Sequence, residues 1–166
     1  MPVTHEPIDP GQLYIPAIDV NSPMMSLPTE VSPDPFLGGK EVQSFGVPPD
    51  MTHTAWWSDG PKIGSDAMAV VLGHAQFGGG FGVFNNIKDL KAGDEITVES
   101  PDASQRVRFK VISVKTGISK RDPDALVNTL NAQPSNARLA LITCGGQADL
   151  SVMETDENVV VFAALA

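Results

Sequence analysis

The stretch LALITC, residues Leu139–Cys144, decides how this chain is interpreted. An apolar run of this length that ends on Thr-Cys and breaks into two glycines predicts a strand that delivers a thiol to the rim of a sheet. The run MAVVLGH, residues 68–74, predicts a second apolar strand, and it ends on His74. A cysteine and a histidine that each close a strand are the parts of a thiol nucleophile and its proton partner.

Cys144 is the single cysteine of the chain, and the residues alone leave its role open. A lone cysteine is more often a small buried hydrophobic residue than a nucleophile. His74 by itself carries still less weight. Their shared position at strand ends adds weight to the catalytic interpretation, and both interpretations stay open on the residues alone.

The bulk composition bounds the class of protein. A length of 166 residues suits one domain with its own core. A net charge of −9 argues against nucleic acid as a partner and against a basic patch on an anionic membrane. No apolar run is long enough to span a membrane and no signal peptide opens the chain, so we expect either a cytosolic protein or one whose N-terminal anchor lies outside this sequence.

The order of predicted elements is rich in strands. Strands are expected over residues 13–20, 41–46, 95–99, 106–117 and 158–165, besides the two that end on His74 and Cys144, and a shorter piece is expected over 24–27. Short helices are expected over 83–90 and 123–130, and the glycine-rich run 78–82 is expected to be flexible. The strand over 106–117 alternates apolar and basic residues, which predicts one buried and one solvated face. Residues 1–11 are expected to form a flexible lead-in to a single β-barrel domain over 12–166.

Several of these runs together resemble the sortases. They are LYIPAI at 13–18, VVLGH at 70–74, LKAGDEI at 90–96, LITC at 141–144 and NVVVFA at 158–163. The run LITC is similar to the TLxTC box of that family, with Ala140 in place of the first threonine. The resemblance extends from about residue 12 to the end of the chain, and it is closest to the actinobacterial class E/F group.

The resemblance implies a mostly-β fold, an eight-stranded barrel with two short helices, and cysteine transpeptidase chemistry. Sortases cleave an LPxTG-type sorting signal after its threonine, form a thioacyl intermediate and pass it to an amine. Cys144 would then be the nucleophile and His74 the acid and base, because thiolate is the attacking species and the leaving amine needs a proton.

The same resemblance implies the partners and the place of action. The expected partners are a sorting-signal peptide and an amine acceptor, such as a cell-wall precursor or a pilin lysine. The implied location is the outer face of a Gram-positive cell membrane, with the anchor outside this sequence. No cofactor and no metal is expected, since the acidic residues over 149–157 do not fit the spacing of a calcium loop.

The chain departs from the family at one residue. Sortases carry an arginine on the last strand, and the matching position here is Asn158; neither lysine nor arginine follows Arg138. An asparagine donates hydrogen bonds without charge, so we hypothesise that Asn158 supports the oxyanion; a strand-capping asparagine is the alternative. Arg121, at the start of a loop, is the candidate stand-in for binding substrate, together with Thr143 of the cysteine box.

Two other functions stay open. Because the family arginine is missing, the protein is alternatively a catalytically impaired sortase fold that binds peptide without processing it. A thiol hydrolase of another kind is the third possibility, and it would release acid even in the presence of abundant amine.

Overall fold

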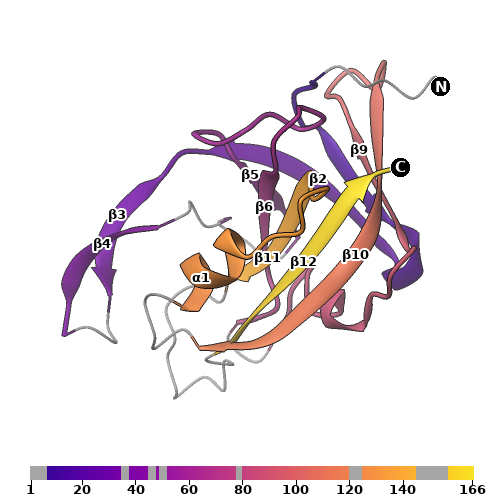
Figure 1. Cartoon of the computed structure of the whole chain (residues 1–166). Helices are drawn as coiled ribbons and strands as arrows, with labels where there is room; N and C mark the ends of the chain where they lie inside the picture. Colours follow the sequence, from indigo (N-terminus) through magenta and orange to yellow (C-terminus); the bar gives the residue numbers. More distant parts are fainter. Residues whose placement is uncertain are drawn as a thin grey trace.

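The computed structural model describes residues 7–34, 38–44, 48, 52–77, 80–119, 125–144 and 157–166, and its main body is a closed barrel (Figure 1). Eight strands close the barrel in the order β1-β2-β5-β6-β11-β12-β10-β9, with β9 pairing back to β1. The predicted mostly-β fold with an eight-stranded barrel is therefore confirmed.

The barrel strands are β1 (Gln12–Ile15), β2 (Val20–Leu27), β5 (Thr54–Trp57), β6 (Ala69–His74), β9 (Glu95–Glu99), β10 (Arg106–Ser119), β11 (Leu139–Cys144) and β12 (Glu157–Leu165). Two small hairpins stand outside it, β3 (Glu30–Asp34) with β4 (Lys40–Ser44) and β7 (Gln76–Phe77) with β8 (Gly80–Phe81). The helical elements are α1 (Ala125–Asn131) and the 3-10 turns η1 (Pro16–Ile18) and η3 (Ile87–Asp89). Figure 1 shows the β3–β4 hairpin extending away from the barrel.

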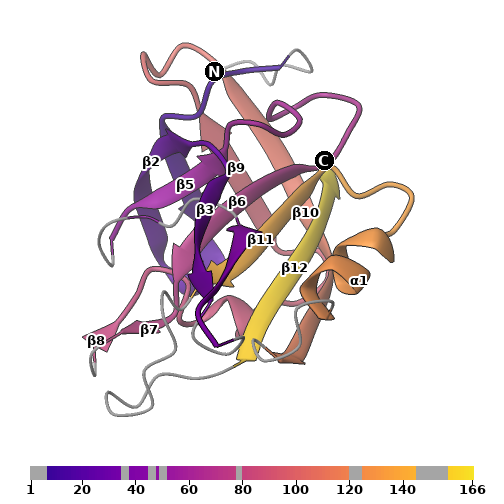
Figure 2. The same ribbon diagram turned by 90° about the vertical axis from the view of Figure 1, so that its left-hand side faces the viewer.

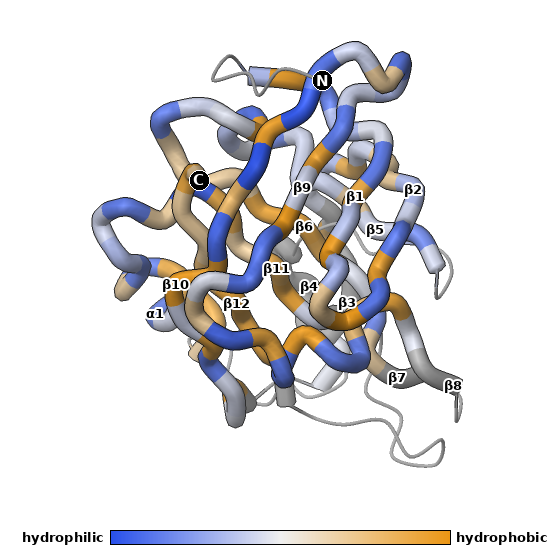
Figure 3. Tube along the Cα trace, turned by 90° about the vertical axis from the view of Figure 1, so that its right-hand side faces the viewer, coloured by the Kyte–Doolittle hydropathy of each residue, from blue (hydrophilic) through white to orange (hydrophobic). Residues whose placement is uncertain are grey.

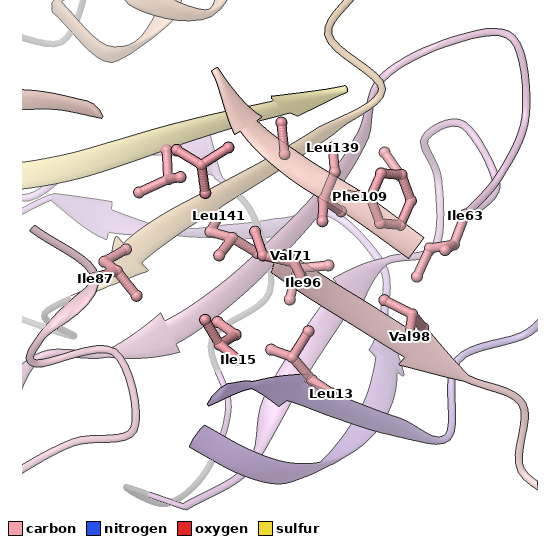
Figure 4. Packing of buried hydrophobic residues seen from close by; sticks show 14 of the residues in the cluster. Leu13, Ile15, Ile63, Val71, Ile87, Ile96, Val98, Phe109, Leu139 and Leu141 are labelled. Atoms are coloured by element: carbon pink, nitrogen blue, oxygen red, sulfur yellow. The ribbon is translucent and has the colours of Figure 1, made fainter. Parts of the chain in front are cut away.

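Alternation along β10 builds the barrel interior as the sequence predicts. Val107 and Phe109 are buried, whereas Arg106 and Arg108 point outward and pair with glutamates of β9. Figure 3 shows this alternation on that side of the barrel. Side chains from the strands, from the connection between β5 and β6 and from the segment before β9 fill the interior (Figure 4): Leu13, Ile15, Ile63, Val71, Ile87, Ile96, Val98, Phe109, Leu139 and Leu141.

Strands β6, β11 and β12 are buried on both faces. Their inward residues belong to the barrel interior, and their outward residues form a second apolar cluster with Ile118 and Ala137: Val70, Leu72, Ala140, Ile142, Val160 and Phe162. Leu126 and Leu130 of α1 pack against this outer cluster, and Figure 2 shows α1 beside β12. Burial on both faces explains why these three strands are continuous apolar runs instead of alternating ones.

Three local predictions differ from the structure. The strand expected over 13–20 is two antiparallel strands, since Pro16 opens the turn η1 and Asp19 takes a left-handed conformation with φ of 57°. The helix expected over 83–90 is a run of turns that ends in η3, although its apolar spacing does bury Phe84, Ile87 and Leu90. The run 78–82 was expected to be flexible, but Gly82 is closely packed; residues 78–79 lie outside the described residues.

Three further points concern the second helix, the expected lead-in and membrane-spanning helices. The second expected helix is α1, and residues 120–124 before it lie outside the described residues. Within the expected lead-in, Ile8 is buried and its N–H donates to the carbonyl of Ile63. In the described part of the chain, no helix has the length and apolarity that crossing a membrane requires.

Candidate active site

His74 and Cys144 are direct neighbours across two strands. They end β6 and β11, which run parallel to each other (Figure 2). The register pairs Cys144 with His74, as it pairs Thr143 with Gly73. Neighbouring strands lie about 4.8 Å apart. Two residues that are distant in the sequence are thus brought to the same end of the sheet, as expected from sequence. For Cys144 the structure describes the backbone and not the side chain, so this placement is that of the strand position.

The imidazole of His74 is buried, with 5% of the residue exposed. Its Nε2 lies 2.8 Å from the carbonyl oxygen of Pro48. A carbonyl only accepts, so Nε2 carries the proton that is donated to Pro48. In the neutral ring the lone pair is then on Nδ1, which makes Nδ1 the nitrogen that gains and loses a proton.

The backbone of His74 is held by the segment that follows the β7–β8 hairpin. The N–H of Phe84 donates to the His74 carbonyl over 2.9 Å, and the N–H of Gly82 donates to the Ala75 carbonyl over 2.7 Å. Phe84 is fully buried in the barrel interior. The end of β6 is therefore tied to the core from its loop side as well as from β11.

Thr143 closes the ladder between β11 and β12. The last backbone pair of these strands is Ile142 with Val160. One residue further, the N–H of Val159 donates to Oγ1 of Thr143 over 2.8 Å, and Thr143 is only 4% exposed. The hydroxyl thus replaces a backbone acceptor beside the strand end. A substrate-binding role for Thr143 stays a prediction.

Asn158 lies at the same end of the barrel, on the strand next to Cys144. Its backbone pairs with Ile118 of β10, and its Oδ1 is buried with no hydrogen-bond partner among the described residues. Leaving a buried polar atom unpaired costs about 1–3 kcal/mol. This acceptor lies on the strand next to that of Cys144, and it is available to a bound ligand.

The arginines of the described residues are engaged away from this end. Arg106 and Arg108 pair with glutamates of β9, and Arg138 donates to the carbonyls of Ser135 and Ala137 just before β11 begins. Arg121, the candidate for substrate binding, lies outside the described residues. Within the described ranges, no group of three or more His, Cys, Asp or Glu side chains is placed to hold a metal ion.

Sequence reasoning missed the contacts that hold His74. Nothing in the sequence pairs Pro48 with a histidine 26 residues later. A weak signal for the loop contact was present, because a glycine precedes His74 and the glycine-rich run ends two residues before Phe84. Glycine at such positions often marks a close approach of two backbones.

Comparisons with known proteins agree with the fold described above. A family model described as Sortase domain matches residues 13–166. SrtA sortase from Actinomyces oris is a similar solved structure, with 22% identity, a TM-score of 0.60 and coverage of 100% of this chain and 86% of that chain. Sortase C from Clostridium perfringens is similar with 17% identity, a TM-score of 0.60 and coverage of 97% and 72%.

Sortase A from Corynebacterium diphtheriae is a third similar structure, with 18% identity and a TM-score of 0.60 over 97% of this chain and 62% of that chain. At these identities the likeness to solved structures shows the fold. Among curated proteins, no sequence matches this chain.

Proposed function

The chain belongs to the sortase family, a family of cysteine transpeptidases, and on that premise we propose that Cys144 is its nucleophile and His74 its acid and base. The proposed reaction cleaves an LPxTG-type sorting signal and transfers the acyl part to an amine. The observation that carries the proposal is the register of β6 and β11, which pairs these two residues at the ends of adjacent parallel strands.

The proposed steps follow from the protonation of each group. The Cys144 thiol first passes its proton to Nδ1 of His74. The resulting thiolate attacks the threonine carbonyl of the signal, an S–C bond forms, and the C–N bond to glycine breaks. His74 gives its Nδ1 proton to the departing nitrogen, while its Nε2–H remains bound to Pro48. The incoming amine then attacks the thioacyl carbon. His74 accepts a proton from the amine nitrogen, and the C–S bond breaks to release the thiolate.

Asn158 is proposed to support this chemistry in place of the family arginine. Its position at the same barrel end, with an unfilled acceptor, supports contact with the bound peptide. Its amide nitrogen is the donor for the oxyanion. Asn158→Ala should lower kcat by about 100- to 1000-fold, the loss typical of removing one oxyanion donor. Near-wild-type turnover in a variant with unchanged melting temperature would leave Asn158 as a strand-capping residue.

Arg121 and Thr143 are proposed to bind the substrate. Arg121→Ala should raise KM with little change in kcat, because a residue that binds substrate and transition state equally acts on KM alone. An unchanged KM would remove Arg121 from the site. For Thr143, the test must separate substrate binding from the structural bond to Val159.

A trapping experiment tests the function as a whole. The protein is incubated with an LPxTG-type peptide and analysed by intact mass spectrometry, with Cys144→Ala as the matched control. We expect a thioacyl adduct on the wild-type chain alone, and an amide product when an amine acceptor is added. Peptide binding without an adduct would indicate the impaired, peptide-binding alternative, which the missing arginine favours.

The same experiment addresses the third function. A thiol hydrolase would form the adduct but release acid even with amine in excess. The proposed acceptors are a cell-wall precursor or a pilin lysine, and the proposed site of action is the outer face of the cell membrane. A sortase domain in general indicates a cell-surface enzyme.

A further inference from the structure

We propose that Gly82 is a positioning residue for His74, because its backbone, which carries no side chain, packs directly against the end of β6. The proposal rests on the proposed function and deepens it. It concerns a residue outside the Cys144–His74–Asn158 set, eight positions after the histidine in the sequence.

The approach of Gly82 to His74 leaves no room for a side chain. A Cβ atom at Gly82 would meet the carbonyl oxygen of His74 first, then its carbonyl carbon at 2.5 Å and its Cβ at 2.8 Å. Real Cβ atoms essentially never come within 3.0 Å of such atoms. Two of the three are backbone atoms and the third is the root of the catalytic side chain, so none can rotate away.

Two hydrogen bonds fix this approach. The Gly82 N–H donates to Ala75, the residue after the histidine, and the Phe84 N–H donates to His74 itself. These two bonds attach residues 82–84 to the end of β6. A displacement of this segment passes to His74 through both bonds.

The core anchors the same segment. The Phe84 ring is fully buried and lies against Gly73, where a Cβ would come 2.8 Å from Cδ2 of the ring. Glycines therefore flank the histidine on both sides of the contact, one before it on β6 and one on the returning segment. Because neither glycine has a side chain, Phe84 and the segment that carries it pack directly against the backbone at the end of β6.

The conformation of Gly82 makes the inference clean to test. Gly82 is absent from the glycines with positive φ, which among the described residues are Gly38, Gly39, Gly64, Gly93 and Gly117. Alanine at Gly82 therefore avoids the left-handed φ that favours glycine, and its effect comes from the contact with His74.

The experiment compares Gly82→Ala with Gly11→Ala. Gly11 is a matched control because it is also crowded by backbone, with Cα of Pro101 2.6 Å from an added Cβ, and it too lacks a positive φ. It lies where β1 begins beside the end of β9, away from His74. Both variants should melt at a lower temperature than the wild type.

The kinetic expectation separates the two variants. With an LPxTG-type peptide, Gly82→Ala should lower kcat by about 100-fold, the scale of a catalytic group misplaced by an ångström. Gly11→Ala should keep kcat within about two-fold, and KM should change little in either variant. Equal kcat values for Gly82→Ala and the wild type, or an equal loss in both variants, would overturn the positioning role.

A readout without turnover keeps the two proposals apart. The ring ¹⁵N and ¹H resonances of His74 should shift in Gly82→Ala and stay in place in Gly11→Ala. If the wild type fails to turn over peptide, the proposed function falls, and these resonances still decide the positioning role. Unshifted His74 resonances in Gly82→Ala would refute it.

A second pair of variants covers poor folding of Gly82→Ala. Phe84→Leu loosens the anchor while leaving Gly82 intact, and Phe109→Leu is its control, fully buried in the same interior cluster. We expect Phe84→Leu alone to shift the His74 resonances and to lower kcat. Equal behaviour of the two leucine variants would overturn the proposal.

Discussion

Thr143→Val tests how the ends of β11 and β12 are held together at the candidate site. The substitution keeps the shape of the side chain but removes the hydroxyl that accepts the Val159 N–H. Since Thr143 is 4% exposed, water does not readily replace that acceptor. An unpaired buried donor costs about 1–3 kcal/mol.

The expected change in melting temperature follows from the size of the chain. For a domain of 150–250 residues, 1 kcal/mol corresponds to about 2–4 °C. Thr143→Val should therefore melt about 2–12 °C below the wild type. Thr143→Ser retains the hydroxyl and should recover most of this difference. Thermal unfolding followed by circular dichroism, with urea unfolding as a check on the m-value, measures both variants.

The outcome also decides between two roles of the hydroxyl. A valine variant with the wild-type melting temperature but a raised KM would refute the structural argument and support substrate binding by Thr143. A lower melting temperature with unchanged KM would support the structural role. A lower melting temperature together with a raised KM would mean that the hydroxyl accepts from Val159 and also contacts the peptide, since its own proton remains available.

Two further predictions follow from hydrogen bonds at other points. Hydrogen bonds from Ser104 and Ser100 lower the pKa of Asp102 from 3.8 to about 2. Because the folded pKa is depressed, the ionised carboxylate stabilises the fold above pH 3.8, and this contribution is lost as the pH falls toward 2. Asp102→Asn should thus be less stable than the wild type at pH 7, with a difference that shrinks across this window in urea unfolding; a constant difference would contradict the linkage. For His74, long-range ¹H–¹⁵N spectra of the neutral ring should show the Nε2–H tautomer, as the Pro48 carbonyl requires; the Nδ1–H tautomer would contradict the assigned proton path.

Local patterns in the sequence predicted most of the barrel. The alternation of β10 and the apolar runs that end on His74 and Cys144 were sufficient to place strands and faces, because each reflects burial of one or both faces of a strand. Element boundaries failed where backbone chemistry intervened, as at Pro16 and Asp19. The closeness to class E/F sortases stays a prediction, since the similar structures named above are sortases A and C.

The neighbourhood of His74 was less predictable. The pairing of β6 with β11 was not predicted, because no local pattern specifies which strands pair; the resemblance implied only that His74 and Cys144 act together. The contact with Pro48 and the bond between Val159 and Thr143 join segments whose approach depends on the closed barrel. Such contacts depend on tertiary packing, which periodicity and propensity along the chain do not encode.

The parallel pairing of β6 with β11 determines when during folding His74 and Cys144 come together. Strands β9 and β10 and helix α1 lie between them along the chain, so His74 and Cys144 meet only after a long loop has closed. Contacts between sequence-distant residues form slowly, because the chain loses entropy before the contact compensates for it. A chain that lacks β11 would hold His74 without Cys144, its partner in the proposed mechanism. The proposed activity should therefore appear only when the barrel is complete, and the rate at which the Cys144 thiol becomes reactive should report the last stage of folding.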